Sequence, residues 1–343
     1  MENNSLKILE IKDKKIWEDF NLGCSNPAYF QSWTWGEVEK KRGTGVYRFG
    51  IFEREKIKGI FQIFEIKAKR GHFLQIRQGP VLKEWKKELF MEIINFVKKL
   101  AREKSASFIR ISPLLGVSDQ ELLDLTAAGF RMSPVHNVDA ENRWVLDINK
   151  DQKVLLSQMR KTTRYMIKKG ENIKINVIRS KDSKDIKLFL KIYYQTAKNK
   201  KFIPHSLISE EFEEFGKEGD SILYLAELDK NILAGTLIIY YGKEAIYRHG
   251  ATSFEGRNTP ASYLLQWEAI KDAKEKGIIR YNFWGIARDD NPKNPWYGLS
   301  CFKKGFGGYQ IDFVHSMDLP TKPTYWISFL IDYFTKVKKG YNI

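Results

Sequence analysis

The feature that most constrains the fold is an order of elements that occurs twice along the 343 residues. Residues 46–64 and residues 221–240 both alternate as β-hairpins do, with turns predicted at 53–56 and 229–231. A further strand, a helix with an apolar stripe and another strand follow each hairpin: 71–82, 83–104 and 106–113 in the first half, 244–253, 260–276 and 277–285 in the second. The sequence therefore predicts an α/β (α+β) protein of two similar domains, residues 1–145 and 146–318, with mixed, mostly antiparallel sheets.

This order of elements is that of the GCN5-related acetyltransferase (GNAT) fold. That fold normally holds the pyrophosphate of acyl-CoA on a glycine-rich loop, where backbone N–H groups and a helix dipole meet the anion. The corresponding segments are "RQGPVL" from Arg77 and "RNTPASYLL" from Arg257. Both lack the glycine spacing, and a proline removes one donor from each. We expect the fold without its usual acetyl-CoA site.

The formal net charge of +16 favours polyanionic partners such as nucleic acid, phosphorylated metabolites or an anionic membrane. Part of this charge is clustered, because residues 160–174 carry six Lys/Arg and one Glu. A basic amphipathic helix over 154–169 with a solvated face would explain the same cluster. Cys24 and Cys301 are too few for a disulfide framework, which fits a reducing cytoplasm, and residues 1–15 lack the apolar stretch of a signal peptide.

Residues 298–308, "GLSCFKKGFGG", place Lys303 and Lys304 between phenylalanines and glycines. A β-turn with solvated lysines is one interpretation. The other interpretation is a lysine held among apolar side chains, where its charge stabilises a developing anion, with glycines that leave room for substrates. Five scattered histidines offer neither a Ser-His-Asp arrangement nor a metal motif.

Several motifs together resemble the FemABX family, whose members transfer amino acids from aminoacyl-tRNA to the peptide of peptidoglycan precursors. The resemblance covers about residues 27–318 and is carried by "FQSWTWGEVEKKRG", "RQGPVL", "MRKTTRYMIKKGENIKI", "GATSFEGRNTPASYLLQWEAIKDAKEKGIIRYNFWGIA" and "FKKGFGG". It implies two acetyltransferase-like domains. The long coiled-coil arm of some members is not expected, since no sustained heptads occur. The C-terminal segment 319–343, with Trp326, Phe329, Leu330 and Phe334 near helical spacing, is expected to pack on the first domain.

The reaction implied by the resemblance is attack of a stem-peptide amine on the ester of aminoacyl-tRNA, inside a cytoplasmic enzyme of cell-wall synthesis. The acceptor would be UDP-MurNAc-pentapeptide or a lipid-linked precursor, so peripheral contact with the inner face of an anionic membrane is compatible with it. Because an ester becomes an amide, neither ATP, a metal nor a cofactor is required. The oligomeric state is left open.

The resemblance also implies roles for particular residues. Lys303, beside Phe302, would stabilise the transition state, with Lys304 as the alternative if the register shifts by one. The remaining implied residues would bind substrates: Arg164, Thr162 and Lys168 at the precursor diphosphate, and Tyr247 and Tyr263 in the substrate channel or else in the core. Aromatic residues such as Trp296 or Tyr297 would suit stacking of the tRNA 3′ end, and the sequence does not choose between them.

Three positions depart from the family pattern. Glu39 stands where relatives often carry a phosphate-binding lysine, which Lys40 or Lys41 would have to replace. Ser112 and Asn282 stand where relatives commonly have acids, so obvious general bases are missing. Two alternatives therefore stay open: an N-acyltransferase that uses acyl-CoA or another thioester, and a non-catalytic module that binds RNA or anionic lipid.

Overall fold

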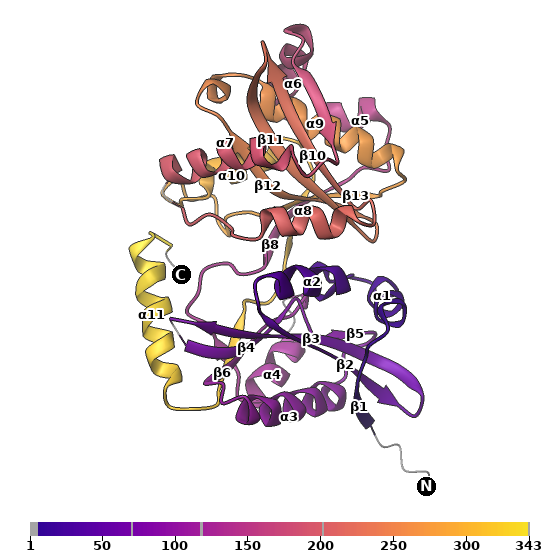
Figure 1. The fold of residues 1–343 in the computed structure, drawn as a ribbon, viewed down its shortest axis with the longest axis vertical. Coiled ribbons are helices and arrows are strands. Elements are labelled where there is room, and N and C mark those ends of the chain that lie inside the picture. The colour runs from indigo at the N-terminus through magenta and orange to yellow at the C-terminus, as the bar shows by residue number, and fades with distance from the viewer. Residues whose placement is uncertain (1–5, 70, 117–118, 201, 342–343) are drawn as a thin grey trace. The chain divides into compact units, whose positions relative to one another are not determined.

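The computed structural model describes residues 6–69, 71–116, 119–200 and 202–341. By its contacts the chain divides into two compact units. Unit 1 comprises Met1–Asn142, Asn291–Pro295 and Asp312–Ile343, and unit 2 comprises Arg143–Asp290 and Trp296–Ile311. The chain thus passes from unit 1 to unit 2 near residue 142 and returns to unit 1 for its C-terminal segment (Figure 1).

Unit 1 is built on one mixed sheet in the order β1-β2-β3-β4-β6-β15-β7, with β5 paired to β3. The only parallel pair recorded in this sheet among the described residues is β4–β6. In Figure 1, α1 and α2 lie on one side of the sheet and α3 on the other. The elements are β1 (Leu6–Glu10), α1 (Lys14–Leu22), the 3₁₀ turn Tyr29–Gln31, α2 (Trp33–Lys41), β2 (Gly45–Glu53), β3 (Lys56–Ala68), β4 (Gly71–Arg77), β5 (Val81–Leu82), α3 (Lys87–Glu103), β6 (Phe108–Ser112), α4 (Asp119–Ala127), β7 (Arg131–Met132), β15 (Met317–Pro320) and α11 (Tyr325–Lys338).

Unit 2 repeats this plan, with a sheet in the order β14-β8-β13-β12-β11-β10-β9 and a parallel pair β12–β13. The elements are β8 (Asn142–Asp147), α5 (Gln152–Gln158), α6 (Lys161–Asn172), β9 (Asn176–Ser180), α7 (Ile186–Lys200), α8 (Ile208–Gly216), β10 (Ser221–Leu228), β11 (Asn231–Tyr241), β12 (Glu244–Thr252), the 3₁₀ turn Glu255–Asn258, α9 (Ala261–Glu275), β13 (Arg280–Gly285), α10 (Tyr297–Lys304) and β14 (Tyr309–Asp312).

The doubled order of elements is present in both units, and the predicted fold class is confirmed. Hairpin β2–β3 corresponds to β10–β11, strand β4 to β12, helix α3 to α9 and strand β6 to β13. In each unit the helix connects two parallel neighbours, as a crossover connection requires. The second hairpin turns at Asp229 and Lys230, which both have positive φ, as the twist of a two-residue hairpin turn demands. The longest helix among the described residues, α3, has 17 residues, so the described chain contains no long coiled-coil arm.

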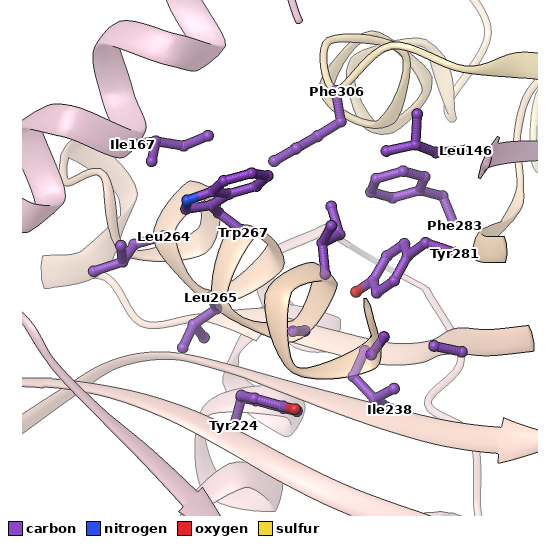
Figure 2. Close-up of a cluster of buried hydrophobic side chains, with 14 of the residues drawn as sticks. Leu146, Ile167, Tyr224, Ile238, Leu264, Leu265, Trp267, Tyr281, Phe283 and Phe306 are labelled. Carbon is purple, nitrogen blue, oxygen red and sulfur yellow. The ribbon is translucent and has the colours of Figure 1, made fainter. Parts of the chain in front are cut away.

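The core of unit 2 lies between its sheet and the helices α6 and α9. On β10, Tyr224 and Ala226 face this core, whereas Leu225 points to the opposite face, where Phe189 of α7 approaches Gly235. Figure 2 shows the core cluster, with the ring of Phe306 extending from the segment after α10 toward the indole of Trp267 on α9. This anchor fixes the end of α10, where the two lysines of the "FKKGFGG" motif lie.

Candidate active site

Lys303 lies in the last turn of α10 with its side chain turned into unit 2. Only 4% of the residue is exposed, and Nζ donates a hydrogen bond of 2.6 Å to the carbonyl of Gly285 at the end of β13. Among the described residues it forms no ion pair, and the ring centroid of Tyr247 is 5.7 Å from Nζ. Burial without a counter-charge lowers the pKa of Lys303 from 10.5 to about 7. Near neutral pH the side chain can therefore exist with or without its proton.

Lys304, the alternative of the sequence analysis, lies in a different environment. Its Nζ forms a 2.6 Å ion pair with Asp290, whose side chain is largely exposed, and lies 5.6 Å from the ring of Trp144. Its charge is thus compensated near the surface. The environment expected of an electrostatic catalyst, a desolvated ammonium with no carboxylate beside it, is found at Lys303.

The carbonyl that holds Lys303 is presented by a backbone turn that Asn282 supports. Asn282 is fully buried, and its side-chain oxygen accepts a 2.9 Å hydrogen bond from the N–H of Trp284, which has φ of 66°. Its amide nitrogen donates to Glu244 at 2.8 Å. The oxygen and the nitrogen of the Asn282 side chain therefore both form hydrogen bonds within the fold. This is a position where the family pattern led us to expect an acid. Sequence reasoning missed Gly285, because a backbone acceptor leaves no signal in the residue type.

Aromatic rings pack around the segment that carries this lysine. Phe302 is half-buried, with its ring centroid 5.0 Å from that of Tyr263 and 5.3 Å from that of Phe306. Burial raises the pKa of Tyr247 to about 12, so its hydroxyl keeps its proton. Phe302, Tyr247 and Tyr263 are all partly buried and all pack against the core cluster of unit 2. The packing expected of the two tyrosines as core residues is thus present, and their place in a substrate channel stays a prediction.

The glycines after Lys304 do not leave room for substrates, contrary to the expectation from sequence. A Cβ on Gly305 would come within 2.6 Å of Oγ1 of Thr163, and one on Gly308 within 2.1 Å of the Val145 carbonyl. Gly307 and Gly308 also have φ of 81° and 100°, which side chains rarely adopt. The glycines instead let the backbone pack closely against α6 and β8. The β-turn interpretation is also wrong for the lysines, because both belong to helix α10.

Close packing at Gly305 brings together two motifs that lie about 140 residues apart in sequence. The carbonyl of Gly305 accepts a 2.9 Å hydrogen bond from the N–H of Arg160, the residue that precedes α6. The basic segment and the "FKKGFGG" segment are therefore neighbours within unit 2. Residues 154–169 belong to two helices, α5 and α6, and do not form the single continuous helix that the alternative interpretation assumed.

The predicted phosphate-binding residues occupy the first turns of α6. Thr162 and Lys168 are exposed, whereas Arg164 is half-buried and its Nη1 donates to the carbonyls of Met159 and, at 3.3 Å, Ser157. Arg164 thus satisfies carbonyls at the C-terminal end of α5. The N-terminal end of α6 also carries the positive pole of the helix dipole, which favours binding of an anion. Lys40 lies in unit 1 on α2, where it forms a 2.9 Å ion pair with Glu37.

Glu39 in unit 1 is buried, and neighbouring side chains of the same unit compensate its negative charge. Arg42 forms an ion pair with it, Thr44 donates to it at 3.1 Å, and a guanidinium nitrogen of Arg77 lies 3.7 Å away. The same Arg77 lies over the ring of Phe30 at 3.4 Å and pairs with Asp139. The arginine of "RQGPVL" is therefore engaged inside unit 1.

Asp139 is a buried acid that the sequence analysis missed. Its Oδ2 accepts a hydrogen bond from the hydroxyl of Ser112, one of the positions where the family pattern led us to look for a carboxylate. A carboxylate is thus present beside Ser112, supplied by a loop 27 residues later in the chain. No local pattern around residue 139 signals this contact. Among the described residues no group of three or more His, Cys, Asp or Glu side chains is arranged to hold a metal ion.

The model of the FemAB family matches residues 14–231 and 208–332, which together span most of the chain. The chain belongs to the FemAB family. A lipid II:glycine glycyltransferase of Staphylococcus aureus (strain MRSA252) is 21% identical over 374 aligned positions, covering 86% of this chain and 89% of the relative.

Solved structures confirm the fold of this FemAB-family chain. The crystal structure of FemX superimposes with a TM-score of 0.82 at 20% identity, covering 94% of this chain and 99% of FemX. A tandem GNAT protein from the clavulanic acid biosynthesis pathway has a TM-score of 0.60 at 11% identity, covering 93% and 99% of the two chains. The resemblance drawn from the motifs and the prediction of tandem acetyltransferase-like domains are both confirmed.

Proposed function

We propose that this chain is an aminoacyltransferase that moves an amino acid from aminoacyl-tRNA to the stem peptide of a peptidoglycan precursor. The observation that carries the proposal is the buried ammonium of Lys303, held by the Gly285 carbonyl without a counter-charge and adjoining a basic helix. Membership of the FemAB family supports the reaction class, and the Staphylococcus relative is itself a glycyltransferase named for lipid II.

The reaction needs stabilisation of negative charge more than it needs a strong base. The neutral amine attacks the ester carbon, the C–N bond forms, and the carbonyl oxygen becomes an oxyanion. When the C–O bond breaks, the ribose oxygen leaves and takes up the proton that the amine loses. Lys303 has three N–H donors and gives one to Gly285, so two stay available for the oxyanion or the leaving oxygen. Because the site is desolvated, such a hydrogen bond contributes more than it would in water.

The basic residues at the start of α6 are proposed to hold the precursor diphosphate. Arg160, Lys161 and Lys168 are exposed there, and the helix dipole adds to their field. Arg164 already donates to backbone carbonyls with Nη1, so we propose that another nitrogen of its guanidinium reaches the phosphate. Thr162 would add a hydroxyl donor. Transfer RNA, a polyanion, would bind to the excess of positive charge, and salt should weaken that binding strongly.

The acceptor is proposed to be either UDP-MurNAc-pentapeptide or its lipid-linked form, used at the cytoplasmic face of the membrane. No helix in the part of the chain that the structure describes is long and apolar enough to cross a bilayer. Glycine is the first amino acid to test, because the Staphylococcus relative transfers it.

The proposal is tested by offering the purified protein tRNA charged with labelled glycine, alanine or serine together with each precursor. Mass spectrometry reads the product, and Lys303→Ala is assayed beside Lys304→Ala as a matched control. Addition of one or more amino acids, lost on Lys303→Ala and kept on Lys304→Ala, is the expected result. If no charged tRNA is used while acetyl-CoA binds and acetylates an amine, the chain is an acyl-CoA transferase and the proposal is wrong.

A further inference from the structure

Helix α11 is arranged with its polar side inward and its apolar side outward. Its buried residues are Tyr325, Ser328, Asp332 and Lys336, which recur on one side of the helix and include three polar side chains. The opposite side carries Trp326, Ile327, Leu330, Ile331, Phe334 and Val337, whose exposed fractions range from 41% to 64%. We call these six residues the apolar face of α11. Helix α11 lies in unit 1 and contacts β4, as the sequence analysis expected of this segment. Of the four spaced apolar residues, however, only Phe329 packs against a buried cluster of unit 1 in the described chain, whereas Trp326, Leu330 and Phe334 are exposed.

Buried polar contacts specify this orientation. Asp332 accepts a 3.1 Å hydrogen bond from Arg110, which is itself buried and also forms a bidentate pair with Asp318. The hydroxyl of Tyr325 donates to Asp318 at 3.4 Å, and its ring lies edge-on against Phe108. Rotating the helix to bury its apolar face would remove Asp332 from a buried guanidinium, which is strongly unfavourable. The outward direction of the apolar face is therefore built into the fold.

The apolar face is large for an exposed surface. From the exposed fractions and the sizes of the side chains, it presents on the order of 500 Å² of apolar surface, near the top of the range for monomeric proteins. Figure 1 shows α11 along one side of unit 1, where it packs on β4. A stable dimer generally needs about 800 Å² from each copy. The face is thus smaller than a typical protein interface, and its area does not favour a second copy as the occupant.

Positive charge lies at both ends of the apolar face. Residues 321–341 contain four lysines and one acid, Asp332, which is buried and paired. Lys322, Lys338 and Lys339 are exposed, and the guanidinium of Arg131 lies 5.0 Å from the ring of Trp326. An apolar stripe with an aromatic residue and a basic border is the composition of helices that lie in the interface of a membrane.

We propose that the apolar face of α11 inserts into the surface of an anionic phospholipid bilayer, with Lys322, Lys338, Lys339 and Arg131 against the lipid phosphates. The helix lies parallel to the membrane plane, because its 14 residues span about 21 Å and its inward side stays bound to unit 1. This surface belongs to unit 1, whereas Lys303 belongs to unit 2, and the proposal does not depend on the transfer chemistry. With a lipid-linked acceptor, it would hold the enzyme on the membrane that carries its substrate.

The test is flotation of the full chain with vesicles of phosphatidylglycerol and phosphatidylcholine, compared with phosphatidylcholine alone. The wild type should float with the anionic vesicles and be released by salt. Leu330→Asp with Phe334→Asp should weaken binding about tenfold or more, since two charges would have to enter the interface. The matched control is Leu123→Asp with Phe254→Asp. These residues lie elsewhere and are 61% and 74% exposed, against 51% and 64% for Leu330 and Phe334, so this variant should bind like the wild type. Lys338→Glu with Lys339→Glu should weaken binding to anionic vesicles alone.

Three outcomes would overturn the proposal. These are absence of flotation with anionic vesicles, flotation that Leu330→Asp/Phe334→Asp leaves unchanged, and a concentration-dependent dimer that this variant dissociates without any vesicle binding. Transfer to soluble UDP-MurNAc-pentapeptide distinguishes this proposal from the proposed function. The α11 variant should keep that activity. If the wild type floats but transfers nothing to any precursor, membrane docking stands and the proposed function fails.

Discussion

Replacing Lys303 by methionine should stabilise the protein at neutral pH, because methionine fills a similar space without a charge. Burial lowers the pKa of Lys303 from 10.5 to about 7. At about 1.4 kcal/mol per pKa unit, the folded state bears a cost of about 5 kcal/mol for the charged lysine below pH 7. Methionine leaves the Gly285 carbonyl without its 2.6 Å partner, which costs about 1–3 kcal/mol. The expected net gain in unfolding free energy at pH 6 is about 2–4 kcal/mol.

The pH dependence of this gain follows from the direction of the pKa shift. Between pH 7 and 10.5 the unfolded chain keeps the Lys303 proton while the folded chain has lost it, so wild-type stability rises with pH over this window. Methionine has no proton to lose, and its advantage should therefore shrink by about 1.4 kcal/mol per pH unit above pH 7. Urea-induced unfolding of both proteins at pH 6, 7.5 and 9 measures the difference. A difference that stays constant with pH, or a Met variant less stable at pH 6, would refute the assignment of a desolvated ammonium.

Three further changes test other parts of the account. The transfer rate at saturating substrates should fall as pH rises above about 7, because the ammonium of Lys303 loses its proton; a rate that keeps rising to pH 9 would contradict a charged role for it. Gly308→Ala should lower the unfolding free energy by about 3 kcal/mol or more, since the methyl group would meet the Val145 carbonyl at positive φ. Gly298→Ala is its control, because no atom lies within 4 Å of the new Cβ, and equal melting curves for the two variants would refute the close packing. Asp332→Ala should lower the free energy of unfolding, measured in urea, by about 1–3 kcal/mol, because it removes one partner of Arg110. An unchanged free energy of unfolding would show that other contacts hold α11.

Repeated local patterns made the fold predictable from sequence. The alternation of residues 221–240 and the turn at Asp229 and Lys230 are properties of neighbouring residues, so the second hairpin could be drawn in advance. The same holds for α9, whose apolar spacing and initial proline indicate its start. Since these patterns occur twice in the same order, even the tandem arrangement could be predicted.

The site could be predicted less completely, because its chemistry depends on contacts between distant segments. The motif indicated Lys303. Its hydrogen bond to the Gly285 carbonyl, and the absence of a counter-charge beside it among the described residues, depend on how distant segments pack and cannot be read from the motif. The sequence alone places an unfavourable carboxylate at Glu39, whereas in the fold Arg42 and Arg77 neutralise it. The sequence likewise lacks an acid at Ser112, whereas the fold places Asp139 beside it.

For helix α11, the sequence pattern predicts the helix but not its orientation. Its apolar spacing predicted a helix correctly, but the spacing does not reveal which side faces the protein. That choice is made by one buried arginine on β6, Arg110, which binds the polar side through Asp332. Periodicity thus gives the element, and buried electrostatics give its orientation.

The most direct test of the central claim is the single-turnover rate of amino-acid transfer from charged tRNA to a peptidoglycan precursor, measured for the wild type, Lys303→Ala and Lys304→Ala. Removing the desolvated ammonium of Lys303 should slow the chemical step about 10²- to 10³-fold, while Lys304→Ala stays within a few fold of the wild type. Equal rates for the wild type and Lys303→Ala, or a loss confined to Lys304→Ala, would contradict the account of this site.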